Sequence, residues 1–215
     1  SAGRPEQTIA TDQDNGLVFA SDDPDADRPA WLAMASEVNH TLDACGYPLC
    51  KGLIMAGQPE CCLSPDEWIA RFGRWIDQGA PKDLLKANIY FDFRPLTGES
   101  SLVEPMRRFV HERASQMPRF TKQMAQNALR NTPRLNWRGA LDPQLDGAHE
   151  WVDLKLNGTM IFVDAARLYA LAHGITETNT RRRREAIAAP LETEPPERAS
   201  WSSAFDFLQM RRRQV

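Results

Sequence analysis

Three aspartates have the type and spacing that divalent-cation chemistry requires. Asp12 and Asp14 are separated by one residue, and Asp92 stands in the centre of Asn88–Arg94, a β-rich run. Side chains alternate along a strand, so Asp12 and Asp14 would share one face with Gln13 turned away, close enough to share hard cations. If the two strands are neighbours, the three carboxylates converge. Three carboxylates around two Mg²⁺ (or Mn²⁺) ions are what an in-line nucleotidyl displacement needs.

The Asp-x-Asp pair alone carries little specificity. Such pairs are common in loops, and Asp14-Asn15-Gly16 also suits a solvated turn. Asp92 adds weight, because a carboxylate on a strand whose other face is apolar must be solvated in a cleft, paired with a cation or bound to a metal.

The elements that would position these acids form a mixed pattern. Leu17–Ala20 predicts a short buried strand followed by a loop over 21–25, and Asn88–Arg94 predicts a second strand. A one-sided stripe from Trp31 to Cys45, ended by Gly46, predicts an amphipathic helix with that stripe buried. Ser64-Pro65-Asp66-Glu67 predicts a capping box that opens another helix.

Helices dominate from residue 100 onward. Pro118 is placed to open one of them, and Gly174 is placed to close another. Asn179 predicts a cap for a short helix whose arginines, 181–184, would face solvent. The predicted fold class is therefore α+β: a small mixed β-sheet core over 1–99 with its first strand missing, followed by a helical C-terminal subdomain over 100–215.

Bulk composition excludes several classes of protein. The chain has 215 residues, 42% of them hydrophobic, and a formal net charge of −3, which does not favour extended nucleic acid as a partner. No apolar run reaches the roughly 20 residues of a membrane span, and no signal peptide is recognisable. Four cysteines without a CxxC pair or a nearby histidine disfavour a zinc centre. We expect a cytoplasmic protein.

Several motifs together resemble a known family. Ser1-x-Gly3-Arg4, the Asp-x-Asp pair and the later Asp92 resemble the signature of the polymerase-β-like nucleotidyltransferase superfamily. More narrowly, the resemblance is to the bacterial DUF294 nucleotidyltransferases, which are similar to the nucleotidyltransferase part of PII-uridylyltransferase. The segments that carry this resemblance lie along essentially the whole chain, at residues 3–8, 11–15, 45–50, 91–94 and 153–155.

The resemblance implies roles for individual residues. Ser1 and the backbone around Gly3 would cradle a nucleoside triphosphate, and Arg4 would offset its charge. Arg94 and Lys155 are further candidates for phosphate contact, each with a structural ion pair as the alternative. The glycine and strand expected before Ser1 are absent, so we expect the sequence to begin inside a motif.

The same resemblance implies roles for the acids and for the parent protein. Asp12 and Asp14 would ligate the ions, and Asp92 would bind the ion that activates an acceptor hydroxyl. Members of the family commonly carry cyclic-nucleotide-binding and CBS modules upstream, which implies signal transduction.

Three functions remain open from sequence. The first is transfer of a nucleoside monophosphate from a triphosphate to a hydroxyl on a protein or small molecule. The second is a catalytically inactive nucleotide-binding regulatory module. The third, an antibiotic-modifying or toxin-like transferase, shares the chemistry of the first and differs only in its acceptor.

Overall fold

The computed structural model describes residues 3, 4, 6, 12–130, 133, 135–139, 142–147 and 149–212. Helices make up most of it, and the few short strands leave the class α+β, as predicted. In chain order the elements are β1 Leu17–Val18, α1 Pro24–Ala44, β2 Cys62–Leu63, α2 Pro65–Gln78, α3 Pro81–Tyr90, α4 Glu104–Ser115, α5 Pro118–Ala128, β3 Gln144–Asp146, β4 His149–Trp151, α6 Met160–Ala172, α7 Thr180–Ile187 and α8 Pro195–Arg212.

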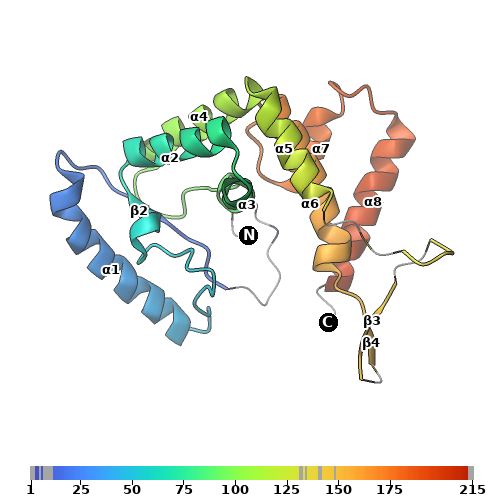
Figure 1. The fold of residues 1–215 in the computed structure, drawn as a ribbon, viewed down its shortest axis with the longest axis horizontal. Helices are drawn as coiled ribbons and strands as arrows, with labels where there is room; N and C mark the ends of the chain where they lie inside the picture. The colour runs from blue at the N-terminus through green and yellow to red at the C-terminus, as the bar shows by residue number, and fades with distance from the viewer. Residues whose placement is uncertain are drawn as a thin grey trace.

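The helices form an arch, with α1 at one end, α3 near the centre and α8 at the other end (Figure 1). None of the helices in the described part of the chain combines the length and apolar character that crossing a membrane requires.

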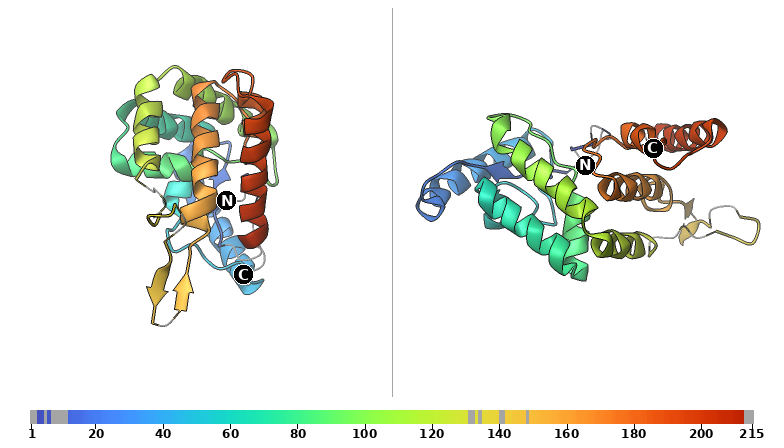
Figure 2. Two further views of the ribbon diagram at one scale, coloured as in Figure 1. Left: turned by 90° about the vertical axis from the view of Figure 1, so that its right-hand side faces the viewer. Right: turned by 90° about the horizontal axis from the view of Figure 1, so that it is seen from above.

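The strands form two small sheets. β1 pairs with β2 in parallel, and β3 pairs with β4 as an antiparallel hairpin. The hairpin extends away from the helices in all three views (Figures 1 and 2). The sheet expected around the acidic residues is therefore reduced, among the described residues, to the two-residue ladder of β1 and β2.

Helix α1 begins earlier than its sequence pattern predicts, and most of the predicted stripe is exposed. Asp23, expected in a loop, is the N-cap and accepts a hydrogen bond from the backbone of Ala26. In the predicted stripe Ala35 is buried but Val38 is 49% exposed, and the polar Asn39, outside the stripe, is buried as well. Asn39 binds the helix to the segment before β1 through hydrogen bonds with Gln13 and Asn15, which a hydrophobic pattern cannot indicate.

Helix α2 confirms its prediction. Ser64 accepts a hydrogen bond from the backbone of Glu67, and the Glu67 carboxylate accepts one from the backbone of Ser64 at 2.8 Å. This reciprocal capping box satisfies two backbone donors that a helix start leaves without partners. The helix ends at Gly79, which takes a left-handed conformation at φ 62°.

The second predicted strand, Asn88–Arg94, does not form. Residues up to Tyr90 belong to α3, and Phe91 and Asp92 follow in a turn, both buried. Pro81 at the first helical position and the buried pair Leu84 and Ala87 on one face direct this segment into a helix. Packing against α2 thus overrides the β-propensity of the aromatic run.

One hydrophobic core runs through the middle of the chain. Its members come from β2, from helices α2 to α6 and from the turn after α3, so it includes residues on both sides of position 100. They are Leu63, Trp68, Phe72, Trp75, Ile76, Leu84, Ala87, Phe91, Met106, Val110, Ala114, Phe120, Met124 and Leu171.

Three predicted helix boundaries in the C-terminal part are confirmed. Pro118 opens α5, and Gly174, at φ 66°, follows the end of α6. Asn179 caps α7 by accepting a hydrogen bond from the backbone of Arg182. The arginine run does not all face solvent, however, because the side chain of Arg183 is fully buried.

Candidate functional site

The segment carrying Asp12 and Asp14 is extended and docked on the loop that follows α1. The backbone of Gln13 donates to the carbonyl of Pro48 at 3.0 Å, and the backbone of Asn15 donates to the carbonyl of Ile54 at 3.1 Å. Gln13 is buried, whereas Asp12 is exposed and Asp14 is half-buried. The predicted alternation of side chains is therefore present, although these residues lie just before β1 and outside it.

Buried amides hold this segment in place. The Gln13 amide donates to the carbonyls of Asn39 and Tyr47 at 2.9 and 2.8 Å and accepts from the Asn39 amide at 2.8 Å. Asn15 accepts from the Asn39 amide at 3.1 Å and from the backbone of Ala56 at 2.8 Å. These bonds fix the backbone while leaving the two carboxylates on the opposite side.

A third ligand-type atom joins the two carboxylates. The Sγ atom of Cys50 lies 3.6 Å from Oδ1 of Asp14. One potential ligand atom from each of Asp12, Asp14 and Cys50 lies within 4.8 Å of the other two, and among the described residues this is the one such group of three.

The electrostatics of Asp14 suit a cation. Burial and the neighbouring Asp12 carboxylate raise the pKa of Asp14, and the hydrogen bond from Cys50 and the charge of Lys155 offset this in part. A divalent ion would remove the repulsion between the two carboxylates. Lys155, in the π-helical turn Lys155–Thr159, thus lies close enough to act on Asp14 electrostatically, although it comes from the far half of the sequence.

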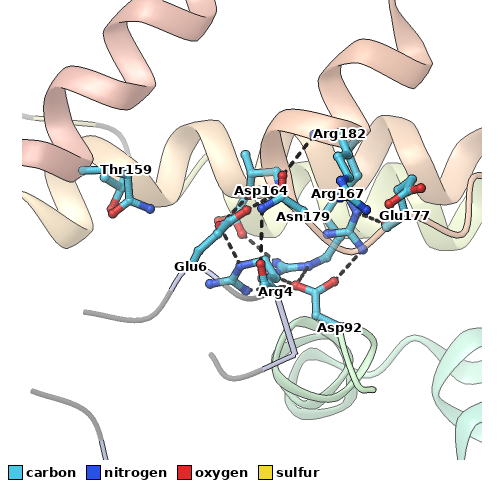
Figure 3. A network of polar contacts seen from close by, with 12 residues as sticks. Arg4, Glu6, Asp92, Thr159, Asp164, Arg167, Glu177, Asn179 and Arg182 are labelled. Atoms are coloured by element: carbon cyan, nitrogen blue, oxygen red, sulfur yellow. Dashed lines mark hydrogen bonds and ion pairs between the residues drawn. The ribbon is translucent and has the colours of Figure 1, made fainter. Parts of the chain in front are cut away.

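Asp92 belongs to a different cluster, in which arginines surround it (Figure 3). Its Oδ2 accepts hydrogen bonds from Arg167 Nη2 at 2.7 Å and from Arg4 Nη1 at 2.9 Å, and its Oδ1 accepts one from Arg183 Nη2 at 2.6 Å. Burial alone would raise the pKa of Asp92, but the charges of Arg167, Arg183 and Arg4 hold that pKa well below its usual range. Asp92 therefore stays ionised as an internal counter-charge.

Positive and negative charges balance in this network. Asp164 pairs with Arg167 at 2.8 Å, and Glu6 pairs with Arg4 at 3.3 Å. With Asp92 and Arg183, three carboxylates meet three guanidinium groups. Burying so many charges is tolerable only because each charge has partners of opposite sign.

The N-terminal motif is part of this network. Glu6 accepts a hydrogen bond from the Thr180 hydroxyl at 2.9 Å and another from the Thr180 backbone at the start of α7. Gly3 packs so closely on the turn after α3 that a β-carbon would overlap the carbonyl oxygen of Asp92, which explains the glycine. The loop resembling a triphosphate cradle thus contacts both Asp92 and α7.

The remaining predicted site residues are placed as follows. The structure does not bring Asp92 into the group of Asp12 and Asp14. Arg94 is exposed, unlike the buried Asp92, so the shared strand face expected for them does not form. Ser1 lies outside the described residues.

Sequence reasoning missed several residues that build these clusters. Cys50 lacks the spacing of a metal motif, and no sequence pattern indicates the stabilising amides Gln13 and Asn39. Arg167 lies within the mostly apolar sequence of α6, which gives no sign that this arginine is buried beside Asp92. The run containing Arg183 was visible, but its burial was not.

The first cluster fits a divalent cation. Two carboxylates supply the oxygen ligands that Mg²⁺ and Mn²⁺ prefer, and the exposure of Asp12 leaves one side accessible to a substrate. The arginine network does not fit one, since every carboxylate oxygen of Asp92 accepts hydrogen bonds from a cation.

Comparison with protein families gives two matches along the chain. Residues 1–82 match the family described as "Putative nucleotidyltransferase DUF294", and residues 118–215 match the "Putative nucleotidyltransferase substrate binding domain". The Asp12–Asp14–Cys50 group lies within the first match, whereas Arg167, Thr180 and Arg183 lie within the second. Comparisons with curated proteins and with solved structures found no match. Two consecutive modules of one family cover most of the sequence, and the chain belongs to the DUF294 nucleotidyltransferase family.

Proposed function

We propose that this chain transfers a nucleoside monophosphate from a nucleoside triphosphate to a hydroxyl acceptor. The observation that carries the proposal is the convergence of the Asp12 and Asp14 carboxylates in a site open to solvent. In the reaction the acceptor oxygen bonds to the α-phosphorus, the bond from that phosphorus to the pyrophosphate oxygen breaks so that pyrophosphate leaves, and the hydroxyl proton passes to solvent. Two divalent cations, Mg²⁺ or Mn²⁺, would supply charge neutralisation of the phosphates and activation of the hydroxyl.

The chain's own residues perform the binding steps. Asp12 and Asp14 hold the cations, and Lys155, whose charge already acts on Asp14, contacts the phosphates. Arg4 and the backbone at Gly3 bind the triphosphate, with Ser1 and Arg94 as further phosphate contacts. To bind phosphate, the Arg4 guanidinium must give up its contact with Asp92, because the carboxylate and the phosphate compete for the same group.

The sequence-based role of Asp92 as a third metal ligand stays a prediction. It requires the Asp92 carboxylate to leave Arg167 and Arg183, which leaves two buried cations to be satisfied in another way. In the arrangement described here, Asp92 instead positions Arg4.

The biological setting is proposed on the same family basis. We place the activity in the bacterial cytoplasm, in a signal-transduction protein with cyclic-nucleotide-binding and CBS modules upstream and an acceptor similar to that of PII-uridylyltransferase. We also propose a division into a core of residues 1–99 and a helical part of 100–215; the two separate family matches, at 1–82 and 118–215, support a division between them. The shared hydrophobic core implies that the two parts fold together.

One observation favours a second candidate, a nucleotide-binding regulatory module without transferase activity. The described residues bring together two carboxylates of the expected three, because Asp92 is engaged by arginines. A site with two carboxylates still binds a cation and a triphosphate, and it lacks the third group assigned to activation of the acceptor.

Calorimetric titration with each of the four nucleoside triphosphates, with and without Mg²⁺ or Mn²⁺, tests the proposed site. Binding that requires the cation, is lost in Asp12→Asn and Asp14→Asn and persists in Asp22→Asn, an exposed control, supports it. Binding unaffected by the cation or by the substitutions contradicts it. Release of pyrophosphate on addition of hydroxyl-bearing acceptors then separates the transferase from the regulatory module.

A further inference from the structure

The backbone hydrogen bonds that hold the segment of Asp12 and Asp14 also position Cys50 as a possible metal ligand. The loop carrying it is bound on one side through the carbonyl of Pro48 and on the other through the carbonyl of Ile54, which accept from the backbones of Gln13 and Asn15. The backbone of Cys50 itself donates to the sulfur of Met55 at 3.3 Å. These contacts hold its thiol at the edge of the acidic pair.

The surroundings of this thiol differ from those of the other cysteines. Cys50 is 7% exposed, and its Sγ atom donates to the Asp14 carboxylate. Cys61 contacts the hydroxyl of Tyr90 at 3.0 Å, Cys62 is buried, and Cys45 is exposed. Among the described cysteines, Cys50 is the one that belongs to a cluster of possible metal ligands.

The donor set of two carboxylates and one sulfur has a clear chemical preference. Mg²⁺ takes oxygen ligands almost exclusively, whereas thiolate sulfur selects softer ions such as Zn²⁺ and Cd²⁺. When sulfur coordinates a metal, the thiol gives up its proton to solvent and the metal–sulfur bond replaces the S–H bond. Asp12 and Asp14 therefore suffice for the hard cation, and the sulfur contributes only when a thiophilic cation is present.

We propose that Cys50 makes the Asp12–Asp14 site a selective site for thiophilic divalent cations, so that Zn²⁺ or Cd²⁺ displaces Mg²⁺ from it. The proposal rests on the proposed function in one respect, that Asp12 and Asp14 bind a cation. It adds a form of regulation: the same site responds to the level of thiophilic metal through one buried thiol. Oxygen-only coordination would give no such response.

Cd²⁺ is the probe, because its bond to a thiolate produces a charge-transfer absorption in the ultraviolet that oxygen ligands do not. We compare the unsubstituted chain with Cys50→Ser, with Cys45→Ser as the exposed-cysteine control, and with Asp14→Asn. The unsubstituted chain and Cys45→Ser should show the band at one equivalent of Cd²⁺. In Cys50→Ser we expect loss of the band and a Cd²⁺ affinity lower by roughly tenfold or more, with Mg²⁺ affinity changed less than about twofold.

The outcomes separate this proposal from the proposed function. A band that persists in Cys50→Ser, or equal losses of Cd²⁺ and Mg²⁺ affinity, overturns the role of Cys50 and leaves the Asp12–Asp14 site intact. Unchanged Mg²⁺ and Cd²⁺ binding in Asp14→Asn overturns the cation site itself. Circular dichroism verifies folding, and Cys50→Ala provides a second variant that removes the sulfur without adding a hydroxyl.

Discussion

Arg4 and Asp92 are 88 positions apart in the sequence, yet Arg4 Nη1 lies 2.9 Å from Asp92 Oδ2 inside the protein. This contact joins the motif that resembles a triphosphate-binding loop to the turn after α3. Through Arg167 and Arg183 the same carboxylate also reaches α6 and α7. The Asp92 carboxylate therefore connects Arg4, in the region that matches the nucleotidyltransferase family, with Arg167 and Arg183, in the region that matches the substrate-binding domain. We expect substitutions of Asp92 to lower the stability of the fold.

Asp92→Asn should lower the free energy of unfolding by about 3–5 kcal/mol, because it leaves Arg167 and Arg183 buried without their shared counter-charge. Denaturant unfolding followed by circular dichroism measures the change. Asp77→Asn, which breaks an exposed pair with Arg113, is the control and should cost less than about 1 kcal/mol. Equal effects of the two substitutions would show that the buried network does not stabilise the fold.

Asn39→Ala should affect both stability and cation binding. Loss of its hydrogen bonds to Gln13 and Asn15 leaves buried polar groups without partners, at a cost of about 1–3 kcal/mol. The Asp12–Asp14 segment then loses its fixed position, so the affinity for Mg²⁺ should fall as well. His40→Ala, exposed on the same helix, should change neither quantity; unchanged Mg²⁺ affinity in Asn39→Ala would exclude a positioning role.

Stability should fall between pH 6.5 and pH 4 because of His111. Burial and the charges of Arg183 and Arg107 lower the pKa of His111 to about 4, and Asp92 opposes this shift. The unfolded chain, with a histidine pKa of about 6.5, therefore binds a proton in this window that the folded chain does not. The expected loss is about 3 kcal/mol and is complete below pH 4.

His111→Gln should flatten this part of the pH profile of unfolding. His173→Gln, at the exposed C-cap of α6, should retain the slope of the unsubstituted chain. If both variants keep the slope, a different group titrates in this window. Asp92 contributes little there, because the unfolded chain takes up a proton at this carboxyl only near its ordinary pKa of 3.8, and the lowered pKa in the folded chain extends the resulting loss of stability to more acidic conditions.

A double-mutant cycle on Glu6 and Thr180 should reveal coupling between the two matched regions. Glu6→Ala and Thr180→Val each remove a side chain from the hydrogen bond of 2.9 Å, so their effects on the free energy of unfolding should fall short of additivity by about 1 kcal/mol. Replacing Thr180→Val by Thr176→Val, at an exposed position outside this contact, should give additive effects. Additivity in the first cycle would mean that the N-terminal motif does not dock on α7.

The sequence by itself determined the features that depend on neighbouring residues. The capping box at Ser64 and Glu67, the opening of α5 at Pro118 and the glycine after α6 follow from local backbone chemistry. Asp12 and Asp14 point to the same side because successive side chains of an extended chain alternate between two faces. Family motifs along the chain indicated the nucleotidyltransferase family.

Only the tertiary structure decided where residues distant in sequence would meet. The run Asn88–Arg94 has the propensity of a strand, but its first residues form the end of α3, which packs on α2, and Asp92 in the following turn contacts the arginines. Cys50 approaches Asp14 because two backbone hydrogen bonds align segments separated by a whole helix. Burial of a charged group such as Arg183 depends on its pairing with Asp92 in the turn after α3, and no local pattern around residue 183 encodes that partner.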